Sequence, residues 1–380
     1  MPIRTGSDPK LRLAFDFGSF PLFAGSGFVG RGTAVKILVT GGSGFIGGYF
    51  HRELTARGHE IVNLDLVDPS GPIAESAYVK GDVRDPAAVS KALTHFGEPV
   101  DRVVHLAAAH HDFGIEHDTY YDVNENGARV ITEAMDAHNV SELTFYSTVA
   151  IYGEVPEPIT EESDKKFFNP YGGSKWAGEQ VFMGWTDKGV NDAGRQRRCL
   201  TIRPTVTFGP NNFANMYSLI RQVDSGKYAQ FGKAANIKSL SYVENIVDAT
   251  LHLWDYEGRA DYDPYNWIDK PDLSSGEIAV ACMESLGKGS KPITVPLALG
   301  LLAGVPFDVV IKLTGKNLPI STARIKKLFT MQTKYEADKV LATGYTPKVP
   351  LKEGIDRMVK WYVSEGKDQD AEWHIPPAKA

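Results

Sequence analysis

The stretch Val35–Gly47, VKILVTGGSGFIG, decides the fold of this chain. Five of its first six residues are aliphatic or β-branched, which is typical of a buried parallel strand. The strand runs directly into a cluster of glycines, and a segment of helical pattern follows from Phe45 to Arg57. The stretch therefore predicts a strand, a tight glycine turn and a helix.

Three glycines of this turn have distinct expected roles. We expect Gly41 to permit the tight turn, Gly44 to let the backbone approach a pyrophosphate, and Gly47 to let the helix pack against the strand. The pyrophosphate would lie on the free N–H groups at the helix N-terminus, where Phe45 and Ile46 stand. In this strand–turn–helix context the glycines predict a dinucleotide site.

Residues 1–34 stand apart from the rest of the chain. Gly25–Gly30 matches G-x-G-x-x-G, but no helix opens on it, so we interpret the match as a chance one in a loop. The apolar patch in this segment is interrupted by Asp16 and Pro21, unlike the core of a signal peptide. The segment is therefore expected to be an N-terminal extension or a weak targeting segment.

The composition narrows the class of protein. With a net charge of −6 and no long basic run, the chain is expected not to bind nucleic acid. Cys199 and Cys282 lie far apart without metal-ligand spacing, which predicts a reducing, cytoplasmic environment and no metal site. The apolar stretch Ile293–Ile311 is broken by two prolines and Asp308, so no membrane span is predicted.

Strand and helix patterns alternate after the first unit. Strands are predicted at residues 60–65, 78–83, 102–109 and 143–148, and helices at 86–96 and 117–138. This alternation implies an α/β fold with a Rossmann-type, doubly wound parallel sheet and right-handed crossovers. A smaller mixed α/β lobe is expected to follow toward the C-terminus.

An acid ends the second predicted strand. Asp65 lies eighteen residues past Gly47, about where a carboxylate accepts hydrogen bonds from the adenosine ribose. A negative charge there repels a 2′-phosphate, so the site is predicted to prefer NAD over NADP. The simpler alternative is a solvated acid in a turn, and Asp68 competes for the role. Farther along, Asp82 is a plausible partner for adenine.

The clearest candidates for chemistry are Tyr171 and Lys175. They come after a fifth strand that ends in Ser147 and Thr148, and they stand four apart on a predicted helix, so they share a face. An ammonium beside a phenol favours the phenolate and lowers a pKa that is ordinarily about 10. Tyr171 would then exchange a proton with a substrate hydroxyl, also hydrogen-bonded by Thr148, while hydride passes to or from nicotinamide. By itself, this spacing more often marks only a solvated helix face.

Eight features occur in order along the chain: TGGSGFIG, Asp65, GDV, HLAA, VNENG, STVAIYG, Tyr171-x-x-x-Lys175 and Arg203-Pro204. In this order they resemble the extended short-chain dehydrogenases/reductases. Over residues 35–365 the chain looks like an NAD-dependent nucleotide-sugar epimerase/dehydratase, similar to UDP-glucose 4-epimerases. The resemblance implies that Tyr171 is the acid/base, that Lys175 also holds the nicotinamide ribose, and that Thr148 rather than Ser147 occupies the Ser/Thr position.

The resemblance also implies the remaining site residues. Cofactor contacts are expected from Gly41, Gly44, Phe45, Ile46, Gly47, Asp65, Asp82, Val83, Leu106, Ala107, Ala108, Asn124, Ser147, Tyr171, Lys175, Arg203 and Pro204. Substrate contacts are expected from His110, Thr148, Asn212 and Lys238. Lys238 stands where sugar-nucleotide enzymes of the family typically carry an arginine on the diphosphate, and lysine cannot make the bidentate fork.

Two positions discriminate between activities. Val149 and Ala150 follow Thr148, where family 4,6-dehydratases carry an Asp-Glu pair and decarboxylases generally a nearby Glu; neither residue can move a proton. The prediction is therefore an epimerase of a nucleotide-activated sugar, acting at C4 through a keto intermediate with bound NAD recycled. The alternative is a net NAD(P)-dependent oxidoreductase on a sugar nucleotide or a 3β-hydroxysteroid-like alcohol. A third possibility is a non-enzymatic NAD-binding protein.

Four segments are predicted: the extension 1–34, an NAD-binding domain 35–204, a substrate lobe 205–365 interleaved with the last Rossmann elements, and a polar tail 366–380. Within the lobe, Pro296–Ile311 is predicted to be a helix that belongs to the core rather than lining an apolar pocket. By resemblance, helices near 117–138 and 171–185 are expected to pair in a homodimer.

Overall fold

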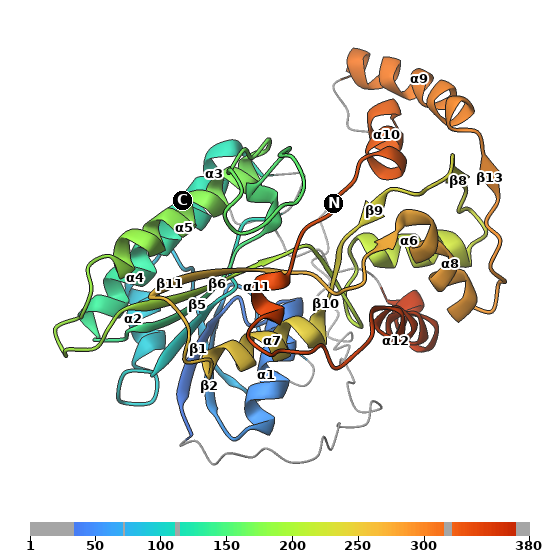
Figure 1. Ribbon diagram of the computed structural model, residues 1–380. Coiled ribbons are helices and arrows are strands. Elements are labelled where there is room, and N and C mark those ends of the chain that lie inside the picture. The colour runs from blue at the N-terminus through green and yellow to red at the C-terminus, as the bar shows by residue number, and fades with distance from the viewer. Residues whose placement is uncertain (1–33, 71–72, 111–114, 315–320, 370–380) are drawn as a thin grey trace, which may run out of the picture.

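The computed structural model describes residues 34–70, 73–110, 115–314 and 321–369. The Gly25–Gly30 match, the rest of the N-terminal extension and most of the polar tail lie outside these ranges. In the described part, a seven-stranded sheet forms one layer, and a lobe of helices and short strands lies beside it (Figure 1).

The sheet is parallel throughout, in the order β11-β6-β5-β4-β1-β2-β3. Its strands are β1 (Lys36–Thr40), β2 (Glu60–Asp65), β3 (Ala77–Lys80), β4 (Arg102–His105), β5 (Glu142–Tyr146), β6 (Arg198–Pro204) and β11 (Tyr262–Trp267). The order reverses between β1 and β4, which is where doubly wound sheets bind ligands at the carboxyl ends of their strands. The predicted fold class is confirmed.

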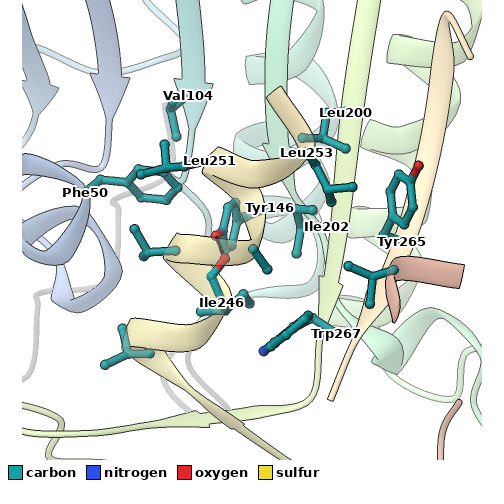
Figure 2. Packing of buried hydrophobic residues seen from close by; sticks show 14 of the residues in the cluster. Phe50, Val104, Tyr146, Leu200, Ile202, Ile246, Leu251, Leu253, Tyr265 and Trp267 are labelled. Atoms are coloured by element: carbon teal, nitrogen blue, oxygen red, sulfur yellow. Dashed lines mark hydrogen bonds between the residues drawn. The ribbon is translucent and has the colours of Figure 1, made fainter. Parts of the chain in front are cut away.

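Alternate residues of β1 face opposite layers, as strand geometry requires. Ile37 and Val39 belong to a buried cluster with α1 (Phe45–Ala56) and α7 (Val243–Trp254). Leu38 belongs to the opposite cluster, with α2 (Pro86–Leu93), α4 (Gly127–Ala137) and α5 (Pro170–Thr186). Figure 2 shows the first cluster, in which Phe50 of α1 and Ile246 of α7 lie near Tyr146 of β5. The central strands are thus buried on both faces.

The predicted helix 117–138 is a continuous helical segment with three parts. These are α3 (His117–Tyr121), a π-helical turn (Asp122–Asn126) and α4. Such turns often occur at functional sites.

The C-terminal lobe packs α6 (Asn215–Asp224), α8 (Ser275–Ser285) and α12 (Leu351–Ser364) around Phe208 and Tyr242. Three short strand pairs complete it: β7 (Val206–Phe208) with β10 (Leu240–Tyr242), β8 (Gln230–Phe231) with β13 (Thr294–Val295), and β9 (Ile237–Lys238) with β12 (Leu273–Ser274). The remaining helices are α9 (Leu297–Thr314), α10 (Thr322–Thr330) and α11 (Asp338–Leu341).

The helix predicted at 296–311 is confirmed as α9, but its assignment to the core is wrong. Leu302 is 67% exposed and Leu313 is 79% exposed. Figure 1 shows α9 at the edge of the molecule, with α10 next to it. Within the described ranges, no helix combines the length and the apolar character needed to cross a membrane.

Candidate active site

The glycine turn after β1 has no room for side chains at two positions. Gly41 has a φ of 70°, and a Cβ there would lie 2.6 Å from the backbone N of Ala107. A Cβ at Gly47 would lie 2.5 Å from the carbonyl O of Gly42. These contacts bring the turn against the end of β4 and let α1 start directly on it, as the sequence predicts.

The N-terminus of α1 is suited to an anion. Its N-cap is Gly44, which provides no side-chain cap in the described structure, and the first turn contains no acid. The first N–H groups of a helix have no intrahelical partner, and the helix dipole places partial positive charge there. A pyrophosphate is therefore a fitting ligand for this turn.

Asp65, rather than Asp68, lies beside the turn. Its carboxylate accepts hydrogen bonds from the backbone N–H groups of Ser43 at 3.0 Å and Val67 at 3.1 Å. Asp68 instead pairs with Lys80 at the surface. The position at the end of β2 fits the predicted contact to an adenosine ribose, and that contact stays a prediction.

The neighbouring predicted cofactor residues line the ends of the strands. Leu106 and Ala107 donate their backbone N–H groups to the carbonyl O of Thr40, which holds the exit of β4 against β1. Ser147 is buried, and within the described residues its Oγ has no hydrogen-bond partner. An unpartnered buried hydroxyl at this edge is consistent with a ligand group that completes the site.

Asp82 is held by a neighbour. Its carboxylate accepts hydrogen bonds from the backbone N–H and the guanidinium of Arg84, which also contacts Asp122. Burial opposes ionisation of Asp82, but the hydrogen bonds from Arg84 outweigh it and lower the pKa of the carboxyl. Asp82 is thus a fixed anion after β3, and its contact to adenine stays a prediction.

Thr148 precedes a 3-10 turn and Tyr171 lies in the first turn of α5, and these two segments are in contact. Asn169 caps α5, since its Oδ1 accepts the N–H of Gly172 at 2.7 Å. A Cβ at Gly172 would lie 2.6 Å from the carbonyl O of Ala150, so the first turn of α5 rests on the 3-10 turn (Val149–Ile151) that follows Thr148. Thr148 Oγ1 accepts the N–H of Ala150 at 3.1 Å, which leaves its hydroxyl hydrogen to donate elsewhere.

Lys175 lies in an apolar slot behind the strand ends. It is 2% exposed, and its Nζ is 4.1 Å from the ring centroid of Phe145. Burial lowers the pKa of Lys175 to about 7, although the negative charge of Glu179 acts in the opposite direction. Burial and the charge of Lys175 lower the pKa of His105 to about 3, so its ring is neutral and hydrogen-bonds Thr40 at 2.7 Å. The lowered pKa of Lys175 thus lies near neutral pH, and that of His105 lies well below it.

Arg203 serves a buried framework that the sequence did not reveal. Its guanidinium pairs with Glu179 at 2.7 Å and donates to Tyr152 Oη at 2.8 Å and to the carbonyl O of Glu161 at 3.1 Å. Tyr262 of β11 donates to the same Glu179 carboxylate at 2.7 Å. Glu179 of α5 is thus held by Arg203 of β6 and by Tyr262 of β11. A direct contact of Arg203 to the cofactor stays a prediction.

Asn124 also has its side chain committed within the protein. Its Oδ1 accepts the N–H of Ala109 at 2.9 Å, and its Nδ2 donates to the carbonyl O of Ala109 and to Ser174 Oγ. The residue thereby joins the π-helical turn to the exit of β4 and to α5. The side chain of Asn124 thus helps to position α5, and its predicted contact to the cofactor stays a prediction.

The predicted substrate residues lie on separate segments. His110 is exposed beyond β4, with Nδ1 3.2 Å from the carbonyl O of Ala108. Asn212 accepts the N–H of Ala214 at 3.0 Å through Oδ1. Lys238, on β9, donates to the carbonyl O of Met331 at 2.8 Å. A hollow of about 370 Å³ lies near β9, lined by Lys233, Asn236, Phe329 and neighbouring residues.

The family model of the NAD dependent epimerase/dehydratase family matches residues 37–266. The chain belongs to this family. It is 36% identical over 335 residues to an N-acetyl-α-D-glucosaminyl-diphospho-ditrans,octacis-undecaprenol 4-epimerase of Escherichia coli O157:H7, and the match covers 88% of this chain and 97% of that protein. It is 30% identical over 343 residues to a UDP-glucose 4-epimerase of Lactobacillus helveticus, covering 82% and 96%.

Solved structures share the fold. The UDP-glucose 4-epimerase of Thermus thermophilus, crystallised with NAD, has a TM-score of 0.65 and 23% identity, and the match covers 87% of this chain and 99% of that chain. The family assignment confirms the predicted class, an NAD-dependent enzyme of the extended short-chain dehydrogenase/reductase type. The glycine turn, the uncapped N-terminus of α1 and the Ser147 hydroxyl, unpartnered among the described residues, fit that cofactor.

Proposed function

We propose that the protein is an NAD-dependent 4-epimerase of a sugar joined to its carrier through a diphosphate. The observation that carries the proposal is the intact set Thr148, Tyr171 and Lys175, followed at Val149 and Ala150 by residues that cannot transfer protons. Elimination of water, as in a dehydratase, needs a further acid and base there. Two relatives that match most of the chain are 4-epimerases by name, which favours epimerisation over net oxidation or reduction.

Each residue of the set has a defined task in this proposal. Tyr171 removes the proton of the C4 hydroxyl and returns it at the end of the cycle. Thr148 donates its remaining hydrogen to the same oxygen, and Lys175 supplies positive charge that favours the phenolate. When bound, NAD would supply the hydride acceptor and donor for C4, so no net oxidation or reduction is expected.

Two carriers of the sugar follow from different observations. A nucleoside diphosphate carrier follows from the resemblance of the sequence and from the UDP-glucose 4-epimerase relative. A polyprenyl diphosphate carrier is named in the relative with 36% identity. Lys238, which stands at the expected arginine position and donates to the carbonyl O of Met331, does not distinguish the two carriers, because both contain a diphosphate. We therefore include both carriers in the test.

The test uses the full chain purified without added cofactor. It is incubated with UDP-glucose, UDP-N-acetylglucosamine or N-acetylglucosaminyl-diphospho-undecaprenol, while sugar stereochemistry is followed by NMR and NADH by absorbance. The proposal predicts a C4 epimer of at least one substrate with no net change in NADH. A stoichiometric gain or loss of NADH would establish the oxidoreductase alternative instead.

The oligomeric state and location are also proposals. The segment formed by α3, the π-helical turn and α4 packs beside α5, and by family resemblance we propose that these helices form a homodimer interface. Sedimentation velocity of the full chain measures this directly. A purely monomeric species at micromolar concentration would contradict it. A cytoplasmic location, expected from the free cysteines Cys199 and Cys282, likewise stays a prediction.

A further inference from the structure

Helix α9 has one face turned toward the protein. A Cβ at Gly300 would lie 2.3 Å from the ring of Phe231, and a Cβ at Gly304 would lie 2.9 Å from the backbone N of Thr322. Four residues farther on, Asp308 accepts hydrogen bonds from the N–H of Thr322, at 3.1 Å, and from its hydroxyl. The one acidic residue of α9 is therefore used at the start of α10.

The opposite face of α9 is apolar and exposed. This outer face consists of Leu299, Leu302, Val305, Val309 and Leu313, which are 47–79% exposed and recur at three- or four-residue intervals. Single exposed aliphatic residues are ordinary, but a contiguous row of them marks an interaction surface. Figure 1 shows α9 at the margin of the molecule, beside α10.

Positive charge gathers around the same helix. Residues 286–335 contain eight Lys or Arg and one acid, Asp308, in a chain whose net charge is −6. Lys288 and Lys334 are paired with Asp224 and Glu336. Lys291, Lys312 and Lys326 are exposed, and among the described residues they have no ion-pair partner. Two of these lysines lie close to the apolar row: Lys312 is on α9 itself, and Lys326 of α10 lines a hollow together with Leu302.

The apolar outer face of α9 and the lysines near it fit a lipid surface better than a second copy of this chain. A second copy would bring two basic regions together, which costs free energy. An apolar helix face bordered by lysines instead matches a bilayer with anionic headgroups, in which such a helix lies in the interface plane.

We propose that the outer face of α9 and the lysines around it dock this protein on the surface of an anionic bilayer. The apolar row enters the boundary between headgroups and acyl chains, while Lys312 contacts the headgroups. Docking would bring the active site to a sugar whose carrier is anchored in the bilayer; only this consequence rests on the proposed function. The docking itself does not require turnover.

The test is co-sedimentation of the full chain with vesicles of phosphatidylcholine alone or mixed with phosphatidylglycerol. The native chain is expected to bind the mixed vesicles and to lose binding as salt is raised. The double variant Leu302→Glu/Leu313→Glu should bind at least about tenfold more weakly, because two buried leucine side chains are lost. Lys312→Gln should bind about fivefold more weakly.

Val190→Glu is the matched control, because Val190 is 58% exposed but lies outside the lobe. It should bind vesicles like the native chain. Native protein that stays in the supernatant, or a double variant that binds normally, would overturn the proposal. The proposal would also be overturned if the native chain formed a dimer without lipid, the double variant were monomeric, and neither bound vesicles. Thermal unfolding of every variant and NAD titration show that each is folded, so docking and epimerisation can fail separately.

Discussion

The proposed chemistry requires Lys175 to be charged, whereas burial in the folded protein favours its neutral form. The proposed chemistry needs an ammonium near Tyr171, but the side chain is buried against Phe145 and its pKa is lowered to about 7. An unfolded lysine titrates near 10.4, so folding at neutral pH must bury a charge or release a proton. Glu179 partly offsets this cost, because its charge acts to raise the pKa of Lys175.

Lys175→Met should therefore stabilise the NAD-free protein at pH 7, by about 1–4 kcal/mol, while removing turnover. The native protein gains stability as pH rises from about 7 toward 10, since the unfolded chain then holds the proton that the folded chain has lost. The advantage of the variant should consequently narrow at pH 9. Urea unfolding at both pH values measures this; a variant that is less stable than the native chain at pH 7 would contradict the account.

Tyr171→Phe removes the proposed proton-transfer atom and little else. Turnover should fall by about 10²–10⁴-fold, the usual contribution of general acid–base catalysis, while NAD affinity stays close to native. Steady-state kinetics measure the loss of turnover, and titration with NAD measures the cofactor affinity. Tyr256→Phe, which deletes the same atom just beyond α7, is the control and should remain active. Near-native turnover of Tyr171→Phe would remove Tyr171 from the mechanism.

The individual residues of the site were predictable to different degrees. The spacing of Tyr171 and Lys175 predicts that they share a helix face, and both lie on α5. Their catalytic roles, like that of Thr148, rest on the resemblance and stay predictions. Arg203 was expected beside the cofactor, but its partners Glu179, Tyr152 and Glu161 lie 24 to 51 residues away in sequence. No local pattern reveals such partners.

At the scale of elements, the β1–α1 turn was predictable because its steric demands are local. Gly47→Ala should destabilise the protein by about 1–3 kcal/mol and weaken NAD binding, since the new Cβ would lie 2.5 Å from the carbonyl O of Gly42. Gly48→Ala is the matched control, because nothing lies within 4 Å of its Cβ; alanine there should stabilise α1 by about 0.5–1 kcal/mol. Equal effects of the two changes on unfolding and NAD titration would refute this steric explanation.

Strand β11 shows where local patterns fail. Its sequence YDPYNW contains Pro264 and was not predicted as a strand. It occupies the edge of the sheet next to β6, where proline is tolerated because one side of the strand has no ladder to complete. Only the assembled sheet supplies the partner that makes this segment a strand.

At the scale of the whole molecule, the alternating patterns were enough to predict the doubly wound sheet, because each strand–helix unit can form the same right-handed crossover. They were not enough to place α9. A helix that is apolar on nearly every side carries no periodic sign of which face meets protein, so its exposed row emerged only from the assembled lobe.

The central claim is that the hydrogen at C4 leaves as hydride and returns to the same carbon, with protons moved by Tyr171. It is tested most directly with UDP-N-acetylglucosamine and N-acetylglucosaminyl-diphospho-undecaprenol deuterated at C4, analysed by NMR and mass spectrometry after epimerisation in ordinary water. The account predicts that the C4 epimer keeps its deuterium and that no NADH accumulates. An epimer that has exchanged the label for solvent hydrogen would contradict it.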